Sequence, residues 1–88
     1  MYEIYISSEA EKCYKKLDKR SKERINYSIN SISKKPFSGV HIKKLWGELE
    51  GKYRYAIGSL RIVYEVDTKN KIVRIKAIRS RGDVYKKF

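Results

Sequence analysis

The sequence has few of the residues from which disulfides and metal sites are built. Its 88 residues include one cysteine and one histidine, Cys13 and His41. A single cysteine forms no internal disulfide, and one cysteine with one histidine supplies too few ligands for a zinc site. We therefore expect no metal and no cofactor, and we interpret Cys13 as a reduced core residue of an intracellular protein.

Long apolar runs are also absent. No segment approaches the roughly 20 apolar residues of a membrane-spanning helix, and the amino terminus shows no signal-peptide pattern. Hydrophobic residues nevertheless make up 41 % of the chain and charged residues 36 %. This balance predicts a single globular domain over residues 1–88, in the cytoplasm and without a membrane partner.

Acidic residues are scarce. Ten Asp and Glu stand against 22 Lys and Arg, which gives a formal net charge of +12. On so small a domain this charge attracts polyanions and acidic proteins. The composition therefore predicts nucleic acid or an acidic protein as the partner.

Hydrophobic periodicity predicts an α+β domain. Residues 2–6 alternate as a strand, and a helix of about ten residues follows, where Ser8 and Glu11 match a capping box. A second helix is expected from near Ser21 to the breaker Pro36. Three more strands are expected at residues 53–57, 60–66 and 72–78, the first two joined by a type II′ turn at Gly58-Ser59. The order β-α-α-β-β-β predicts an antiparallel helical hairpin on one face of a mostly antiparallel sheet, with the other face open.

Residues 36–51 are expected to form a loop between the helices and the later strands. We interpret Trp46 in this loop as a lid over the core, with a base-stacking platform as the alternative. His41 has no neighbouring carboxylate in the sequence, so we interpret it as a surface residue rather than a general base.

Arginines on the strands form the candidate site. Arg54, Arg61 and Arg79 come from three strands that can lie side by side on the open face. A guanidinium group grips phosphate through two hydrogen bonds and stacks on bases. Clustered guanidinium groups repel one another without an anion, so the set predicts a binding site. Each arginine could instead pair with a nearby acidic residue.

Three segments resemble the RelE/ParE toxin superfamily, in its RelE-like branch. They are "KLWG", "YRYAIGSLRIVYEV" and the closing "AIRSRGDVY". The resemblance covers nearly the whole chain and implies a RelE-like fold. It also implies a toxin of a type II toxin-antitoxin system: a ribosome-dependent endoribonuclease that cleaves messenger RNA in the ribosomal A site and inhibits translation.

The resemblance also implies roles for particular residues. Arg54 and Arg61 would hold the scissile phosphate, Arg79 and Arg81 would flank the leaving oxygen, and Tyr85 would orient the RNA or transfer a proton. The residues expected to bind RNA elsewhere are Lys43, Lys44, Lys52, Lys86 and Lys87. The implied partners are an acidic RelB-like antitoxin in a hetero-oligomer, the ribosome and the messenger.

Two positions depart from the pattern of the superfamily. Ala56 stands where relatives carry a second basic residue, and Ser80 stands where many have histidine. Arginines do not give up protons in proteins, so proton transfer by this set is poor. Electrostatic stabilisation of the transition state remains, together with alignment of the 2′-hydroxyl by the ribosome.

Two other functions fit the same residues. A ParE-like protein would poison DNA gyrase without cutting nucleic acid. A non-catalytic RNA-binding or ribosome-binding module would show salt-sensitive binding and no cleavage products.

Overall fold

The computed structural model describes residues 1–80, apart from the side chains of Leu49 and Ser80. Its elements, in chain order, are β1 (Glu3–Ile6), α1 (Ser8–Lys15), α2 (Lys19–Lys34), β2 (Ile42–Lys44), the 3₁₀ helix η1 (Gly47–Leu49), β3 (Lys52–Ile57), β4 (Leu60–Asp67) and β5 (Ile72–Ser80). This order confirms the predicted α+β class. Within the described residues, no helix is long and apolar enough to cross a membrane.

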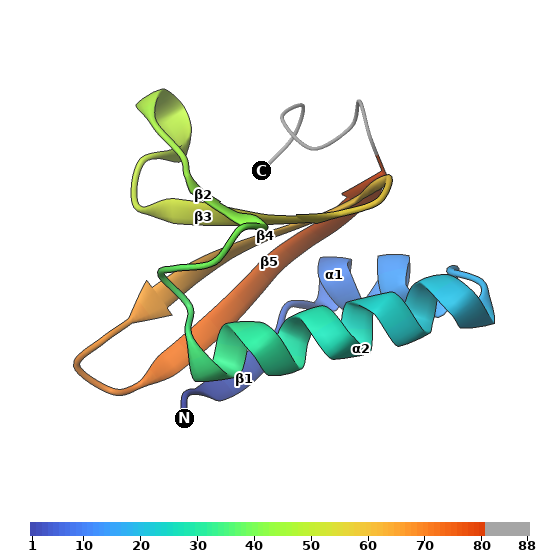
Figure 1. Ribbon diagram of the computed structural model, residues 1–88, viewed down its shortest axis with the longest axis horizontal. Helices are drawn as coiled ribbons and strands as arrows, with labels where there is room; N and C mark the ends of the chain where they lie inside the picture. Colours follow the sequence, from blue (N-terminus) through green and yellow to red (C-terminus); the bar gives the residue numbers. More distant parts are fainter. Residues whose placement is uncertain (81–88) are drawn as a thin grey trace.

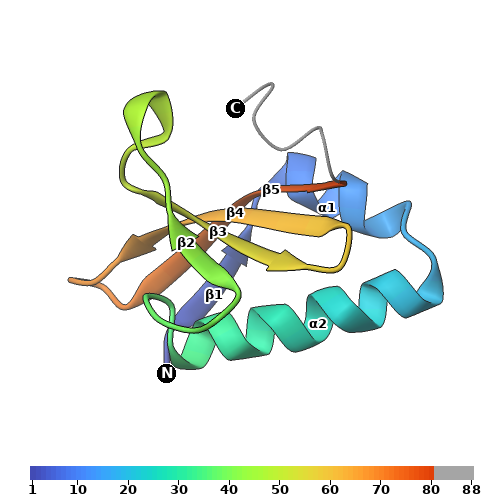
Figure 2. The ribbon, with the colours of Figure 1, turned by 45° about the horizontal axis from the view of Figure 1, so that its top comes forward.

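The strands form one sheet in the order β1-β5-β4-β3-β2. β1 runs parallel to β5, and the remaining neighbours pair antiparallel. Both helices lie on the same face of the sheet, and α2 runs back beside α1 (Figures 1 and 2). The Tyr14 hydroxyl joins the two helices by donating to Asn26 Oδ1 at 2.9 Å. The predicted helical hairpin on one sheet face is therefore confirmed.

The helix starts differ from those predicted. Ser7, not Ser8, caps α1: its Oγ accepts from the Ala10 amide at 3.1 Å and donates to the Lys76 carbonyl at 2.9 Å. Ser7 has extended backbone directly after β1, which aims its side chain over the first turn of the helix. The predicted capping box on Ser8 was therefore wrong. The helix is eight residues long, shorter than expected.

The second helix begins earlier than the predicted Ser21. Asp18 caps α2, accepting from the Ser21 amide at 2.7 Å, so the helix starts at Lys19. That backbone hydrogen bond, with help from the Ser21 side chain, lowers the pKa of Asp18 below its usual value.

The predicted loop over residues 36–51 contains a strand that the sequence did not reveal. β2 is three residues long and pairs with β3, placing Ile42 opposite Tyr55. Three residues are too few for alternation to show in a sequence. The turn between β3 and β4 was predicted correctly, since Gly58 has φ +58° at the first of its two central positions.

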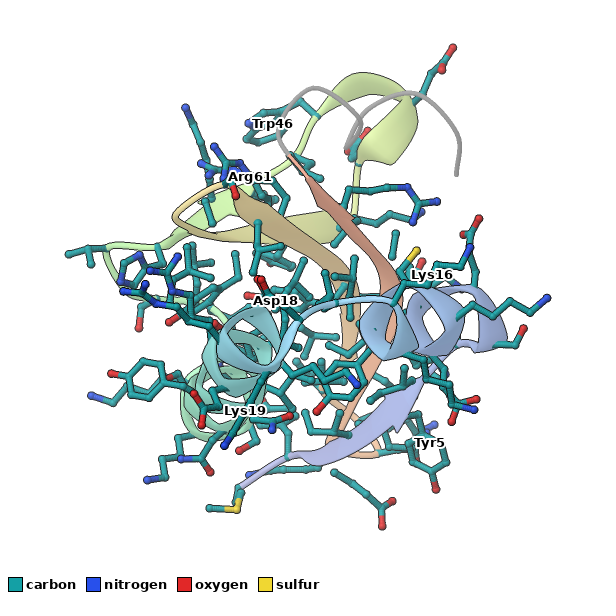
Figure 3. All side chains as sticks on the ribbon, turned by 90° about the vertical axis from the view of Figure 1, so that its right-hand side faces the viewer. Tyr5, Lys16, Asp18, Lys19, Trp46 and Arg61 are labelled. Carbon is teal, nitrogen blue, oxygen red and sulfur yellow. The ribbon has the colours of Figure 1, made fainter. Side chains whose placement is uncertain are left out.

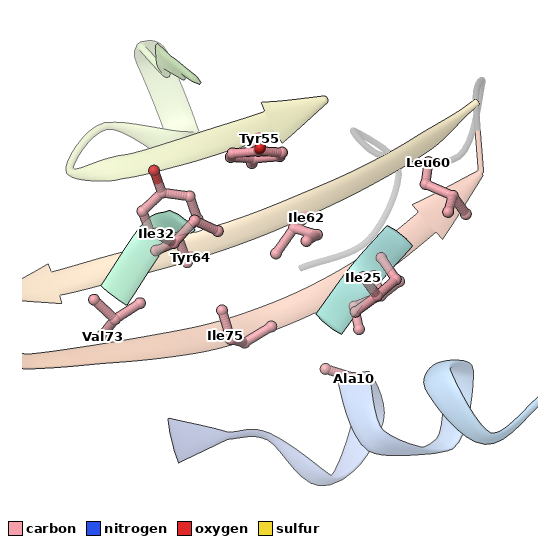
Figure 4. Close-up of a cluster of buried hydrophobic side chains, with 10 residues drawn as sticks. Ala10, Ile25, Ile32, Tyr55, Leu60, Ile62, Tyr64, Val73 and Ile75 are labelled. Atoms are coloured by element: carbon pink, nitrogen blue, oxygen red, sulfur yellow. The ribbon is translucent and has the colours of Figure 1, made fainter. Parts of the chain in front are cut away.

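The main core lies between the helices and the sheet (Figure 4). Its buried side chains are Ala10, Ile25, Ile32, Tyr55, Leu60, Ile62, Tyr64, Val73, Ile75 and Ile78. Cys13 is half-buried and packs against this cluster, as its helical spacing predicted. The Tyr64 hydroxyl donates to the Pro36 carbonyl at 2.7 Å, which ties the segment after α2 to the sheet. Burial raises the pKa of Tyr64 far above its usual value.

Candidate functional site

The open face is the surface of the sheet that is turned away from the helices. Side chains alternate along a strand, so residues next to the core tyrosines of β3 point to this face. The strand register sets Lys43 opposite Arg54, and Arg54 opposite Val63. Toward the other end of the sheet, Arg61 lies between Ala56 and Arg79.

A β-bulge in β5 decides which residues of this strand reach the open face. Val63 pairs with Ala77 but Tyr64 pairs with Ile75, which leaves Lys76 as the extra residue. Val73 and Ile75 belong to the main core, and strict alternation would put residues 77 and 79 on that same side. The extra residue reverses the alternation, so Ala77 belongs to the open face, and Arg79 leaves the strand on that side before its long side chain reaches α1.

A small apolar cluster forms the floor of the open face. Leu45, Val63 and Ala77 are buried together there, apart from the main core. Charged groups beside such a floor lose hydration, which strengthens their attraction for an anion.

Arg54 is half-buried on β3, next to this floor. Its Nε atom is buried and has no hydrogen-bond partner within residues 1–80. No ion pair within residues 1–80 includes Arg54. A buried donor without an acceptor is unfavourable, so Arg54 has an unmet requirement that an oxygen ligand would satisfy.

Arg61 lies on the neighbouring strand β4 and is also half-buried. One of its terminal nitrogens donates to the carbonyls of Gly58 and Leu60, each at 2.9 Å, which fixes the guanidinium at the β3–β4 turn. Figure 3 shows Arg61 on the side of the sheet away from the helices. The methyl group of Ala56 directly opposite adds no second cation.

Arg79 is directed away from the other two arginines. Its guanidinium lies 3.0 Å from Glu9 Oε1 of α1 and donates to Cys13 Sγ at 3.2 Å. Its side chain is 16 % exposed. The register thus brings Arg79 next to Arg61, while the side chain contacts α1. Arg54 and Arg61 thus start from adjacent strands on the open face, whereas the guanidinium of Arg79 is paired with a carboxylate of α1.

The predicted lysines differ in how far other residues neutralise them. Lys52 lies 3.4 Å from Glu65, so its charge is shared. Lys43 is exposed opposite Arg54, and Lys44 is exposed with its ammonium 4.9 Å from the ring centre of Trp46. The other predicted residues, Arg81, Tyr85, Lys86 and Lys87, lie outside the described residues.

Trp46 is not the lid that we expected. Its side chain is 69 % exposed, and Leu45 takes the buried position beside it at 7 %. Leu45 continues the alternation of β2 onto the open face, which leaves Trp46 at the start of the projecting η1 segment. His41 is exposed with its ring 5.1 Å from that of Tyr55, which confirms it as a surface residue.

A helix-backed sheet with cations around an apolar floor is a small α+β domain suited to binding an anionic partner. The sequence matches, over residues 4–85, the family described as the ParE toxin of the type II toxin-antitoxin system, parDE. The chain belongs to this family and hence to the RelE/ParE superfamily. No curated protein matches the sequence.

Solved structures of RelE and YoeB toxins share the fold. The RelE-RelB complex of Pyrococcus horikoshii matches at 26 % identity and TM-score 0.80, over 92 % of this chain and 96 % of that one. The heterotetrameric YoeB-YefM complex of Staphylococcus aureus matches at 28 % identity and TM-score 0.76, over 92 % and 98 %. The RelBE2 complex of Mycobacterium tuberculosis matches at 23 % identity and TM-score 0.79, over 91 % and 98 %. These likenesses agree with the RelE-like branch indicated by the sequence.

Proposed function

We propose that this toxin is a ribosome-dependent endoribonuclease that binds messenger RNA across the open face. The observation that carries the proposal is Arg54, whose buried Nε has no acceptor among the described residues and lies beside an apolar floor. Arg61 projects from the adjacent strand on the same face. Two guanidinium groups on neighbouring strands suit the scissile phosphate, because each can donate to its oxygens.

The chemistry is transfer within the RNA chain. The 2′-oxygen loses its proton and attacks the adjacent phosphorus, and the bond from phosphorus to the 5′-oxygen breaks. The 5′-oxygen takes up a proton, leaving a 2′,3′-cyclic phosphate and a 5′-hydroxyl end. Arg54 and Arg61 stabilise the charge that develops on the phosphate oxygens.

Proton transfer needs a group other than the arginines. Tyr85 is the group we assign to orient the RNA or move a proton, and Arg81 is assigned to the leaving oxygen. The ribosome holds the messenger with its 2′-hydroxyl aligned for attack, which supplies much of what the toxin lacks. Because the ribosome supplies this alignment, we expect the toxin to cleave messenger on ribosomes and to cleave free RNA very little.

Arg79 joins the site through a change of partner. Phosphate and the Glu9 carboxylate are both anions that a guanidinium binds, and Glu9 is itself 56 % exposed. When RNA binds, the phosphate competes with Glu9 for Arg79, which lies opposite Arg61 in the register.

The partner that keeps the toxin inactive is an acidic antitoxin. The net charge of +12 favours a segment rich in Asp and Glu that folds as it binds. The similar solved structures include a RelE-RelB complex and a heterotetrameric YoeB-YefM toxin-antitoxin complex. We expect a comparable hetero-oligomer for this chain.

Cleavage of a defined messenger on purified ribosomes tests the proposal. Mapping the 5′ ends with the parent protein should reveal cuts that are absent on free RNA. Arg61→Ala should lower the cleavage rate by about 100- to 1,000-fold, because the transition-state charge loses a fixed donor. Arg20→Ala, at an exposed position on α2, is the matched control and should stay close to the parent.

Two results would overturn the nuclease. Inhibition of gyrase supercoiling without messenger cleavage would make the chain a gyrase poison. Salt-sensitive RNA binding without product ends on ribosomes would make it a binding module.

A further inference from the structure

Trp46 is unusual among the large side chains of this protein. It is the sole tryptophan of the chain, and 69 % of its side-chain surface is exposed. Tryptophan carries a large apolar surface and is highly buried on average in proteins. An exposed indole therefore invites a ligand with an apolar, flat surface.

The backbone around Trp46 is held in place. Leu45 is buried in the floor of the open face with Val63 and Ala77, and its amide donates to the Lys52 carbonyl at 3.0 Å. Gly47 then takes φ +71° and starts η1, which rises from the sheet on the side away from the helices (Figure 1). The exposed ring is therefore attached to a backbone segment that is held in place at the edge of the open face.

The ring lies on the same side of the molecule as the phosphate-binding arginines. Figure 3 shows Trp46 and Arg61 both on the side of the sheet that the helices leave uncovered. Lys43 lies two residues before Leu45, on the same side of the strand, and is exposed opposite Arg54. A nucleic acid chain that binds Arg54 and Lys43 through its phosphates would pass beside Trp46.

Charged side chains lie around the ring in the chain: Lys44 comes before it, and the exposed Glu48 and Glu50 follow it. The Lys44 ammonium lies 4.9 Å from the ring centre. The other large hydrophobic side chains that are exposed among the described ones lie at Met1, in β1, in α2 and in the 37–40 segment. A protein-docking patch is a contiguous apolar surface, whereas an aromatic ring with a cation beside it is how single strands of nucleic acid are bound.

We propose that Trp46 is a stacking platform for an unpaired RNA base, with Lys43 and Lys44 neutralising the adjacent phosphates. The inference rests on the proposed function and extends it, by adding a subsite that accepts any base. Stacking is tolerant of sequence because every base has a flat π surface. Trp46 therefore adds affinity and fixes the position of the strand without selecting a codon.

The emission of Trp46 reports stacking directly, since the chain has no other tryptophan. A short single-stranded oligoribonucleotide should quench this emission in a saturable titration. Inorganic polyphosphate of matched charge should bind the same lysines and leave most of the emission. Trp46→Ala should weaken oligoribonucleotide binding, followed by fluorescence of a label on the RNA, by about tenfold, and Trp46→Phe should restore most of the affinity.

The matched control is Tyr27→Ala, which removes an aromatic ring that is 63 % exposed on α2. It should bind the oligoribonucleotide as the parent does. Denaturant midpoints of all variants should agree with that of the parent, because both rings are exposed.

Equal quenching by RNA and polyphosphate, or parental RNA affinity in Trp46→Ala, would overturn the stacking platform. Weaker antitoxin binding with unchanged RNA affinity would overturn it too, and would make Trp46 a protein contact. The nuclease proposal can fail separately. If RNA quenches Trp46 emission but the parent protein makes no cut on ribosomes, the nuclease is wrong and the stacking platform stands. Conversely, if the protein cleaves messenger on ribosomes but RNA does not quench its Trp46 emission, the stacking platform is wrong and the nuclease proposal stands.

Discussion

The two faces of the sheet differ in how much apolar surface they bury and in the charge that they carry. The helix-side face buries ten residues in one cluster, and its aromatic and branched side chains fill the space under α1 and α2. On the open face, the described residues that are buried together are Leu45, Val63 and Ala77, and Arg54 lies opposite Val63. The first face supplies most of the apolar burial that stabilises the fold, and the second carries the cations of the proposed binding site.

The polar atoms on the two faces show the same contrast. The buried Tyr64 hydroxyl on the helix side has its acceptor, the Pro36 carbonyl, at 2.7 Å. The buried Arg54 Nε on the open side has no acceptor in the part of the chain that the structure describes. Folding therefore satisfies the Tyr64 hydroxyl, whereas an oxygen ligand of the kind we propose would satisfy Arg54 Nε.

Replacing Arg54 by methionine should separate the effect on cleavage from the effect on stability most strongly. Arg54→Met should lower messenger cleavage on ribosomes by about 100-fold, because a phosphate donor is lost. Its free energy of unfolding should stay equal to the parent or rise by up to about 1 kcal/mol, because a buried donor without an acceptor is removed. Denaturant unfolding and 5′-end mapping measure the two effects.

The control for this change is Arg74→Met on β5, where the arginine is exposed and lies 3.8 Å from Asp67. Both its stability and its cleavage rate should remain near parental values. A marked loss of stability in Arg54→Met would mean that the arginine supports the fold rather than the ligand.

Tyr64→Phe should act on the other face and leave cleavage by the folded protein unchanged. The Pro36 carbonyl loses its donor, so the free energy of unfolding at neutral pH should fall by about 1 to 3 kcal/mol. Burial raises the pKa of Tyr64 above the usual 10.0, so the folded state keeps the phenol protonated while the unfolded state ionises. The contribution of Tyr64 is complete below pH 10 and declines as the pH rises above it.

The free energies of unfolding of the parent and of Tyr64→Phe should therefore converge as the pH rises above 10. Tyr5→Phe, at a position that is 53 % exposed, should match the parent across the same range. A constant difference between parent and Tyr64→Phe at alkaline pH would contradict the assigned cause.

The smallest expected effect comes from the contact that ties the open face to α1. Glu9→Gln removes a negative charge 3.0 Å from Arg79 and keeps the size of the side chain. RNA binding should strengthen by about two- to fivefold at low salt, because Arg79 exchanges Glu9 for phosphate more readily, and the gain should fade as salt increases. Glu11→Gln on the same helix is the control, and weaker binding in Glu9→Gln would refute the exchange.

The helices and the longer strands were predictable from the sequence, whereas the residues at which they begin and the shortest strand were not. Strong alternation at residues 53–57 and 60–66 predicted β3 and β4 to within a residue of their bounds. The cap at Ser7 was missed because two adjacent serines both fit the motif, and only the bend of the chain after β1 distinguishes them. β2 was missed because its partner β3 lies in a later part of the sequence.

The candidate site was predictable in its residue types but not in its contacts. Arg54 and Arg61 on neighbouring strands followed from the hairpin that Gly58-Ser59 closes. The pairing of Arg79 with Glu9 joins residues 70 positions apart in the sequence, so no local pattern encodes it. The exposure of Trp46 likewise depended on Leu45 taking the buried position next to it.

The amino-acid sequence by itself determined the charge, the two helical stripes and the alternation that makes this chain a basic α+β toxin domain, because these follow from residue order over short distances. Only the tertiary structure decided which side of the sheet the end of β5 presents. One extra residue at Lys76 reverses the alternation there. A bulge arises from how two strands register against each other, so a pattern of period two within one strand does not reveal it.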